Sequence, residues 1–185
     1  MKQSANPSAI RSKRMLTTAL LSLMQTKPYQ EISIKEIAEA SYLNRRTFYR
    51  NFQDKDDIIF QYGTQLVEQL GLAIQSKETF SFAIVCETYF EFWEDNIEYL
   101  HLLQKNNLLY FLFEHIEQYH EQLHFFLPYA MHEESSHFSA TFALGGFFSI
   151  LIQWLKDGAT QSPSQMATQI CNTVKDPFEP KPFHS

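Results

Sequence analysis

Four side chains that can bind nucleic acid fall on one side of a short predicted helix over residues 44–51: Arg45, Arg46, Tyr49 and Arg50. Phe48 and Phe52 lie four residues apart on the other side. An arginine can donate two hydrogen bonds to guanine in the major groove of DNA, and a tyrosine hydroxyl can bind a phosphate oxygen. The pattern predicts a helix anchored by its aromatic side and offered to double-stranded DNA by its basic side. The alternative is a solvated basic helix on an ordinary helical bundle.

Residues at the two ends of this helix can add contacts to DNA. Asn44 is a good helix cap, and Thr47 can donate to a phosphate or touch a thymine methyl group. Asp54 can cap the following helix, which puts Lys55 at a helix N-terminus. There, backbone N–H groups and an ammonium group can share one phosphate. Asn44, Thr47 and Lys55 therefore join the predicted DNA-binding residues.

Two further helices are expected to hold helix 44–51 in place. Residues 8–26 carry apolar side chains at helical spacing, and Pro28 ends that helix because it disfavours helical geometry in the residue before it. The second helix opens at Ser33, with Glu36 three residues later, which is the pattern of a capping box. A three-residue turn then leads to helix 44–51. This order predicts a helix-turn-helix within a three-helix domain.

The segment resembles the tetracycline-repressor (TetR) family of bacterial transcriptional regulators. The resemblance covers about residues 10–62 and is carried by SIKEIAEA at 33–40, NRRTFYRNF at 44–52, and Asp54-Lys55. It implies an all-α homodimer with an N-terminal three-helix DNA-binding domain. It also implies a larger, divergent C-terminal helical domain for dimerisation and, in many members, binding of a small effector. Most members are repressors.

The resemblance assigns roles position by position. The usual phosphate contacts fall on Thr47, Tyr49 and Lys55, and the hydroxyl that caps the second helix falls on Ser33. Three arginines stand where members of the family contact DNA bases or the DNA backbone: Arg45, Arg46 and Arg50. Two positions depart from the family pattern. Tyr42 stands where the turn usually has Gly, so a bulky residue must adopt that geometry or the turn must differ. Asn51 stands where His is frequent, and it can still donate to a phosphate.

Composition and charge agree with two modules. Residues 1–57 hold ten Lys/Arg against six Asp/Glu, a net charge of +4, whereas residues 58–185 hold five against fifteen, a net charge of −10. The basic part can approach phosphates, and the acidic part would be repelled by them. No apolar run is long enough to span a membrane, and the N-terminus lacks the apolar stretch of a signal peptide. Cys86 and Cys171 stand alone, which favours reduced thiols in a cytoplasmic protein.

The C-terminal part is helical in pattern and rich in aromatic residues. A long fourth helix is expected to reach Gln75, followed by helices at about 79–95, 97–105 and 107–127. The aromatic residues can form a solid core or line an apolar pocket for a small hydrophobic effector. The pocket hypothesis names four residues: Phe90, Trp93, Tyr110 and Phe113.

Metal binding and catalysis have little support in the sequence. His120 and His124 lie four residues apart beside acidic residues, a spacing that can hold a divalent metal on a helix. A solvated, mildly pH-sensitive face explains the pair more simply. The chain lacks a Gly-rich phosphate loop and a GxSxG motif, and neither cysteine lies in a catalytic motif. We therefore expect no catalytic residue, no metal and no cofactor.

A long helix over 137–157 is apolar over much of its surface. Together with a last helix that opens at Ser162-Pro163 and runs to about Val174, it suggests a four-helix dimer interface, with an intramolecular core as the alternative. The predicted interface residues lie along the long helix: Phe138, Phe142, Gly145, Gly146, Ile150 and Trp154.

These observations predict a DNA-binding domain over 8–54, an effector-binding and dimerisation domain over 55–176, and a flexible tail over 177–185. The predicted function is a homodimeric regulator, a repressor in most of the family, that binds a palindromic operator and is released by a hydrophobic effector. The alternative is a co-regulator of the same fold that acts through a protein partner, with the acidic C-terminal part carrying the function.

Overall fold

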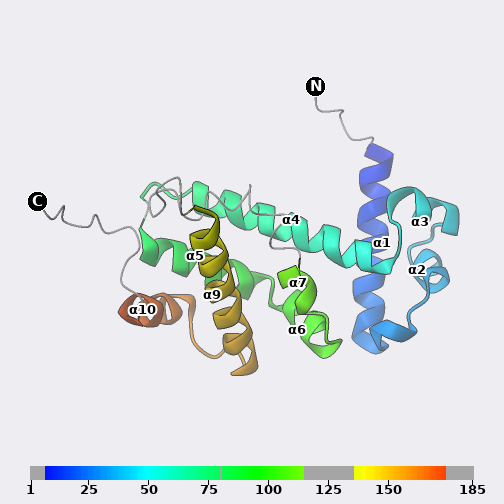
Figure 1. Cartoon of the computed structure of the whole chain (residues 1–185). Helices are drawn as coiled ribbons and strands as arrows, with labels where there is room; N and C mark the ends of the chain where they lie inside the picture. Colours follow the sequence, from blue (N-terminus) through cyan, green and yellow to red (C-terminus); the bar gives the residue numbers. More distant parts are fainter. Residues whose placement is uncertain (1–6, 80, 115–135, 174–185) are drawn as a thin grey trace, which may run out of the picture. The chain divides into compact units, whose positions relative to one another are not determined.

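The computed structural model describes residues 7–79, 81–114 and 136–173, and side chains within these ranges except at 113–114 and 136–140. All regular elements of these residues are helical, as the sequence predicts (Figure 1). They are, in order, α1 (Pro7–Thr26), the 3-10 turn η1 (Tyr29–Glu31), α2 (Ile34–Ala40), α3 (Arg45–Asn51), α4 (Lys55–Gln75), α5 (Phe82–Asp95), α6 (Ile97–Lys105), α7 (Tyr110–Glu114), α9 (Ser136–Lys156) and α10 (Pro163–Thr173).

The chain forms two compact units. Unit 1 comprises residues 1–65 and 101–112, and unit 2 comprises residues 66–100 and 113–185. The long helix α4 therefore begins in unit 1 and ends in unit 2, and α6 contributes its last five residues to unit 1. The tail predicted over 177–185 lies outside the described residues.

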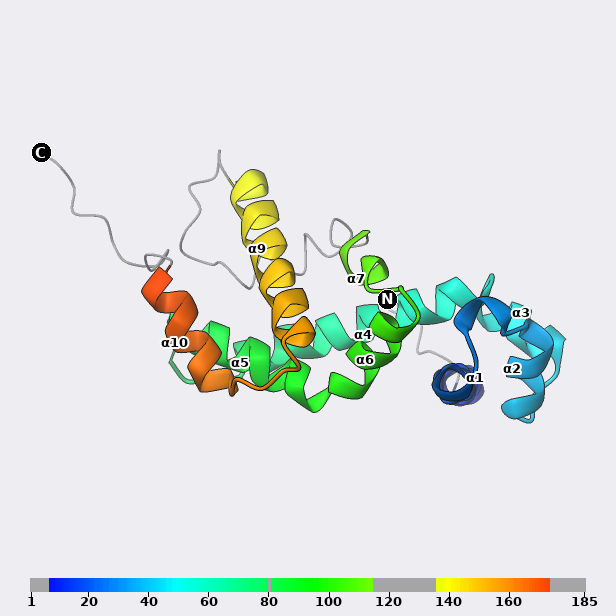
Figure 2. The ribbon, with the colours of Figure 1, turned by 90° about the horizontal axis from the view of Figure 1, so that it is seen from below.

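Unit 1 is built around α1, with α2 and α3 together at its side (Figures 1 and 2). Leu16, Leu20 and Met24 recur along one face of α1 and are completely buried. Ile37 of α2 and Phe48 of α3 are also completely buried, so each short helix contributes an apolar anchor to the same core. Helices of seven residues are too short to be stable alone, and this shared core holds them in place.

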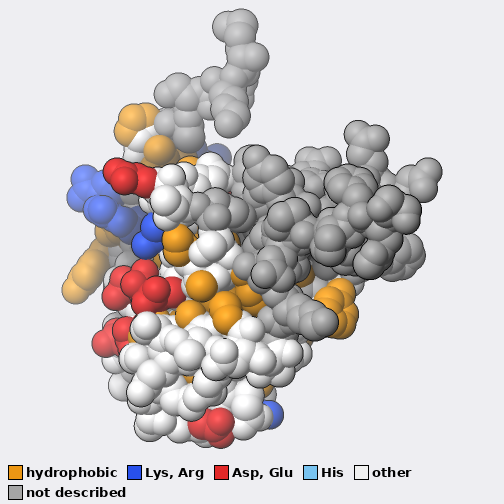
Figure 3. Space-filling model, turned by 90° about the vertical axis from the view of Figure 1, so that its left-hand side faces the viewer, with side chains coloured by type: hydrophobic (Ala, Val, Ile, Leu, Met, Phe, Trp, Pro, Cys, Tyr) orange, Lys and Arg blue, Asp and Glu red, His pale blue; other side chains and the backbone are white. Residues whose placement is uncertain are grey.

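Unit 2 contains a cluster of aromatic rings from α5 and α9. Tyr89 lies with its ring centre 4.9 Å from that of Phe147, and Phe90 lies 5.5 Å from Trp154. Helix α10 packs against α5 and buries Met166 and Ile170. On the side of the molecule that carries α10, Figure 3 shows hydrophobic side chains above a largely uncharged polar surface, with acidic side chains beside them.

The residues predicted to line an effector pocket have different environments. Phe90 and Trp93 are buried in unit 2, with 0% and 3% of their surfaces exposed. Tyr110 belongs to unit 1, is 53% exposed and stacks on Phe111 at 4.5 Å. The side chain of Phe113 lies outside the described residues. A pocket formed by all four residues stays a prediction.

The predicted dimer residues also fall into two groups. Trp154 is buried, and its indole N–H donates to the carbonyl of Gln161 at 2.9 Å, so this side chain belongs to the core of unit 2. Phe142 is 82% exposed, and a Cβ atom added to Gly145 or Gly146 would meet no atom within 4 Å. Ile150 is half-buried, and the side chain of Phe138 is not among those described.

Within the described ranges, no helix is long and apolar enough to cross a membrane, and no cluster of His, Cys, Asp and Glu could hold a metal ion. His120 and His124 lie outside these ranges. Cys86 is buried and Cys171 is half-buried, and neither forms a disulfide bond.

Candidate nucleic-acid interface

The start of α2 is fixed by a capping box. The Ser33 hydroxyl accepts from the Glu36 N–H at 3.2 Å, and the Glu36 carboxylate accepts from the Ser33 N–H at 2.8 Å. Lys27, just after α1, reaches the same carboxylate at 2.7 Å. These bonds from Lys27 and Ser33 lower the pKa of Glu36 to about 2. Glu36 therefore joins the end of α1 to the start of α2.

The turn between α2 and α3 places a tyrosine in the left-handed region of the backbone. Tyr42 has a φ of 56°, and the Leu43 N–H donates back to the Ala38 carbonyl at 2.9 Å. The bulky residue thus adopts the geometry for which glycine is favoured, at a cost of roughly 1–2 kcal/mol. Its side chain is 92% exposed and contributes no burial that would offset this cost.

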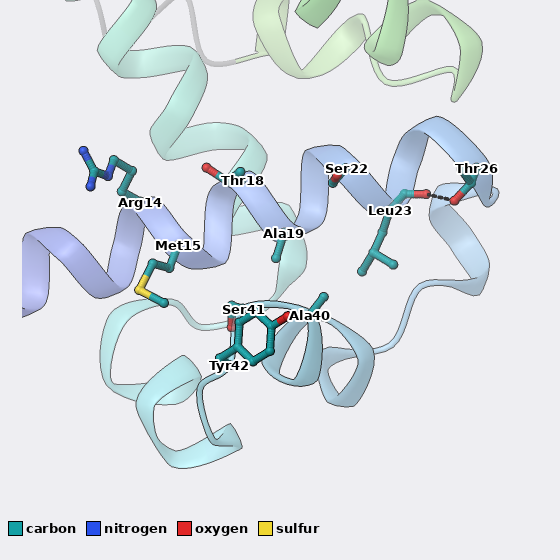
Figure 4. A pocket seen from close by; sticks show the side chains of 10 residues that line it. All are labelled: Arg14, Met15, Thr18, Ala19, Ser22, Leu23, Thr26, Ala40, Ser41 and Tyr42. Atoms are coloured by element: carbon teal, nitrogen blue, oxygen red, sulfur yellow. Dashed lines mark hydrogen bonds between the residues drawn. The ribbon is translucent and has the colours of Figure 1, made fainter.

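A shallow groove of about 560 Å³ runs beside this turn, between α1 and the end of α2. In Figure 4 the Tyr42 ring lies on the α2 side of the groove and Ala19 on the α1 side, while Arg14 points away at one end. The groove lies entirely within unit 1.

Helix α3 is held from its N-terminus and from one face. The Asn44 side chain accepts from the Thr47 N–H at 2.8 Å, which confirms its predicted role as the cap. Phe48 and Phe52 are 0% and 3% exposed, with their ring centres 6.0 Å apart. Lys13 of α1 lies 5.6 Å from the centre of the Phe52 ring. The aromatic side of α3 is therefore buried against unit 1, as predicted.

The opposite face of α3 presents three unpaired guanidinium groups. Arg45, Arg46 and Arg50 are exposed, and none makes an ion pair or a hydrogen bond with another described residue. Tyr49 is 55% exposed, and its ring packs edge-on against Phe48 at 5.5 Å, which leaves the ring fixed beside the arginines. The result is a cationic face on a helix whose opposite face is buried, with hydrogen-bond donors available to a polyanion.

The side chains of Thr47 and Asn51, both predicted to contact DNA, already donate hydrogen bonds to residues of α3 or its cap. The Thr47 hydroxyl donates to the Asn44 side-chain oxygen at 3.1 Å, and the Asn51 amide donates to the Thr47 carbonyl at 2.7 Å. Contact between either side chain and DNA stays a prediction. Thr47 can still accept a hydrogen bond, and the second N–H of the Asn51 amide remains to be donated.

Lys55 has an internal role that the sequence did not reveal. Its ammonium group donates to the carbonyls of Tyr29 at 2.7 Å, Ile32 at 3.1 Å and Gln30 at 3.3 Å. It also lies 4.4 Å from the centre of the Tyr29 ring. Burial lowers the pKa of Lys55. The ammonium group therefore already has three acceptors within its own chain, and the predicted phosphate contact stays a prediction.

Tyr29 likewise has a structural role that the sequence did not reveal. The Tyr29 hydroxyl donates to the Asp56 carboxylate, and its N–H donates to the Asn106 side-chain oxygen at 2.8 Å. Burial and the bond to Asp56 raise the pKa of Tyr29. No local pattern could have indicated the contact with Asn106, because the two residues are far apart in the chain.

Comparisons with known proteins agree with this geometry. Residues 16–62 match the family model described as bacterial regulatory proteins, tetR family. Residues 83–176, slightly more than half of the chain, match the model described as transcriptional regulator C-terminal region. A search of curated proteins gives no match.

Two solved structures are similar over nearly the whole chain. The fatty acid degradation regulator FadR from Bacillus halodurans is 13% identical, with a TM-score of 0.64 and coverage of 92% of this chain and 95% of that one. The dihydroxyacetone kinase operon activator DhaS is 18% identical, with a TM-score of 0.54 and coverage of 89% and 94%. At these identities the likeness shows a common fold.

Proposed function

The chain belongs to the TetR family of bacterial transcriptional regulators, and on that premise we propose that it represses transcription by binding a near-palindromic operator as a homodimer. Family membership makes it a DNA-binding regulator and not an enzyme. The observation that carries the proposal is the row of unpaired guanidinium groups on α3: Arg45, Arg46 and Arg50. In a cytoplasmic dimer, two such helices would enter successive major grooves roughly 34 Å apart.

The proposed contacts divide by the kind of group that each side chain can bind. Arginine recognises guanine edges, so we assign the base-reading role to Arg46 and its two neighbours on α3. Tyr49, Thr47, Asn51 and Ser33 are assigned to phosphates, where hydroxyl and amide groups fix the register of the protein on the duplex.

The proposed dimer interface is the exposed face of α9. Phe142 is 82% exposed, and Gly145 and Gly146 leave open space above the helix backbone. A second helix could approach closely there and cover the phenylalanine ring. Ile150 and Phe138 extend the proposed interface along α9, whereas Trp154 supports it from within the core.

The proposed effector is a small hydrophobic molecule that binds among the aromatic residues of unit 2. The indole N–H of the buried Trp93 has no hydrogen bond of good geometry among the described residues, and its neighbour, the Tyr89 hydroxyl, interacts with it and donates a long bond of 3.4 Å to the Phe147 carbonyl. A ligand that combines an apolar body with one acceptor oxygen would satisfy these donors. The fold is also that of a regulator of fatty acid degradation, which is compatible with an apolar ligand. Binding would alter α4 and weaken DNA affinity.

Selection from a random duplex-DNA pool tests the proposal, with the Tyr49→Ala variant selected in parallel. We expect the wild-type protein to enrich an inverted repeat. The variant loses both the phosphate contact and the ring that packs on Phe48, so we expect it to bind too weakly to enrich any sequence. Absence of enrichment at low salt would favour the protein-partner alternative. Because DhaS is an operon activator, the sign of regulation needs its own test: transcription from a promoter carrying the selected repeat should fall when the protein is added.

A further inference from the structure

In the short connection between α1 and α2, Tyr29 makes hydrogen bonds through three of its groups. Its N–H donates to the side-chain oxygen of Asn106 at 2.8 Å, its carbonyl accepts from Lys55 at 2.7 Å, and its hydroxyl donates to Asp56. The residue is only 3% exposed. Tyr29 therefore has its backbone and its side chain engaged at the same time.

Asn106, which follows α6, uses both ends of its amide group. The oxygen accepts from Tyr29, and the nitrogen donates to the Leu102 carbonyl within α6 at 2.9 Å. The preceding residue, Lys105, donates to the Gln25 carbonyl at 2.7 Å, in the last turn of α1. Two consecutive residues thus bind the chain on either side of Pro28. Figures 1 and 2 both show the turn after α6 beside the C-terminal end of α1.

The bonded connection sets the start of α2. Only three residues separate Tyr29 from Ser33, the cap of α2. The 2.7 Å ion pair between Lys27 and Glu36 joins the residues before this segment to the first turn of α2. A buried N–H without an acceptor is costly, so loss of the Asn106 oxygen would favour opening of this segment. Because only four residues separate α2 from α3, movement at Tyr29 would be transmitted to the face of α3 that carries the arginines.

We infer that Asn106 is a positioning residue for the DNA-binding unit: it fixes the α1–α2 connection and thereby the placement of α3. Asn106 lies within the span that matches the C-terminal family model, yet the structure groups it with residues 1–65. Its effect on DNA affinity rests on the proposed function, whereas its effect on the α1–α2 connection does not.

Amide hydrogen exchange of the full-length protein tests the positioning role without DNA. Asn106→Leu should raise the exchange rate of the Tyr29 and Ile32 amides about tenfold, because the buried N–H loses its acceptor. Asn106→Asp keeps an acceptor oxygen and should leave that rate close to wild type. The matched control is Asn96→Leu, because Asn96 makes the same bond to the carbonyl four residues before it, at 2.8 Å, but belongs to unit 2. Equal exchange at Tyr29 in the two leucine variants overturns the inference.

The second readout is affinity for the duplex that the wild-type protein selects. Asn106→Leu should raise Kd about five- to tenfold without changing the salt slope, since Asn106 donates to no phosphate, and Asn96→Leu should not. A change in exchange with no change in Kd overturns the link to DNA. If Asn106→Leu does not fold, Lys105→Met replaces it in the test. We then expect Kd to rise about threefold. An unchanged Kd would contradict the inference. Failure of the wild-type protein to bind any duplex would refute the proposed function. The hydrogen-exchange experiment would still test whether Asn106 fixes the α1–α2 connection.

Discussion

The ammonium group of Lys55 lies 2.7 Å from the carbonyl oxygen of Tyr29 and 4.4 Å from the centre of the tyrosine ring. The first residue of α4 is thereby bound to the connection between α1 and α2. The N-terminus of α4 consequently contributes directly to the structure of the DNA-binding unit. If the proposed effector alters α4, this contact would transmit the change directly to the segment that precedes α2.

Lys55→Met should lower the stability of the protein. Three carbonyl oxygens lose a charged donor, and a hydrogen bond to a charged group is worth roughly 1.5–3 kcal/mol, so we expect a loss of about 2 kcal/mol in urea unfolding. DNA affinity should fall for all sequences alike. The salt slope should stay unchanged if the ammonium group is fully used inside the chain. A slope reduced by about one would instead establish the phosphate contact that the sequence predicts.

Glu36 should make stability depend on pH in the acid range. Its pKa is lowered from 4.5 to about 2 in the folded protein, so the stabilisation that it provides is complete above pH 4.5 and is lost as the pH falls toward 2. Glu36→Gln removes this contribution. The difference in urea midpoint between wild type and variant should therefore be largest near neutral pH and should shrink between pH 5 and pH 2. A difference that stays constant over this range would contradict the assignment.

Tyr42→Gly should stabilise the protein. The left-handed conformation costs a non-glycine residue roughly 1–2 kcal/mol, while glycine loses about 0.5–1 kcal/mol more backbone entropy on folding. The net gain should be about 0.5–1 kcal/mol, since the 92% exposed ring contributes little burial. Asn107→Gly is the matched comparison, because Asn107 has a φ of 58° but asparagine tolerates this region better. The gain at Tyr42 should exceed the gain at Asn107, as measured by thermal unfolding.

Two substitutions on α3 should separate base reading from phosphate binding. Arg46→Ala should relax the preference for one base pair of the selected site and cost roughly 1–3 kcal/mol there. Tyr49→Phe should weaken binding to specific and non-specific duplexes by the same factor, because it removes one phosphate contact. Titration of a set of duplexes with single base changes distinguishes the two patterns. A uniform loss from Arg46→Ala would remove it from the base-reading set.

The sequence predicts the local features of this fold well and the long-range ones poorly. Ser33, Asn44 and Ser162 identify helix starts because capping depends only on the next three residues. The burial of Phe48 and Phe52 follows from their spacing on a short amphipathic helix. The contact between Tyr29 and Asn106 has no such periodic signal. For Lys55 the sequence predicts only a phosphate contact, because its three carbonyl acceptors come from a distant turn whose path only the folded chain defines.

A size series at Gly145 should test the dimer. A Cβ added at Gly145 meets no atom within 4 Å in the single chain, so Gly145→Ala and Gly145→Leu should both preserve the fold of the protomer. Replacing glycine within a helix should even raise helix propensity by about 1 kcal/mol. If a second α9 approaches this surface, however, the leucine side chain must displace it and the alanine side chain much less. We expect the dissociation constant of the dimer, from analytical ultracentrifugation, to rise little for alanine and by a factor of about 10–100 for leucine. A leucine variant that remains as tightly dimeric as the wild type would move the interface away from this face of α9.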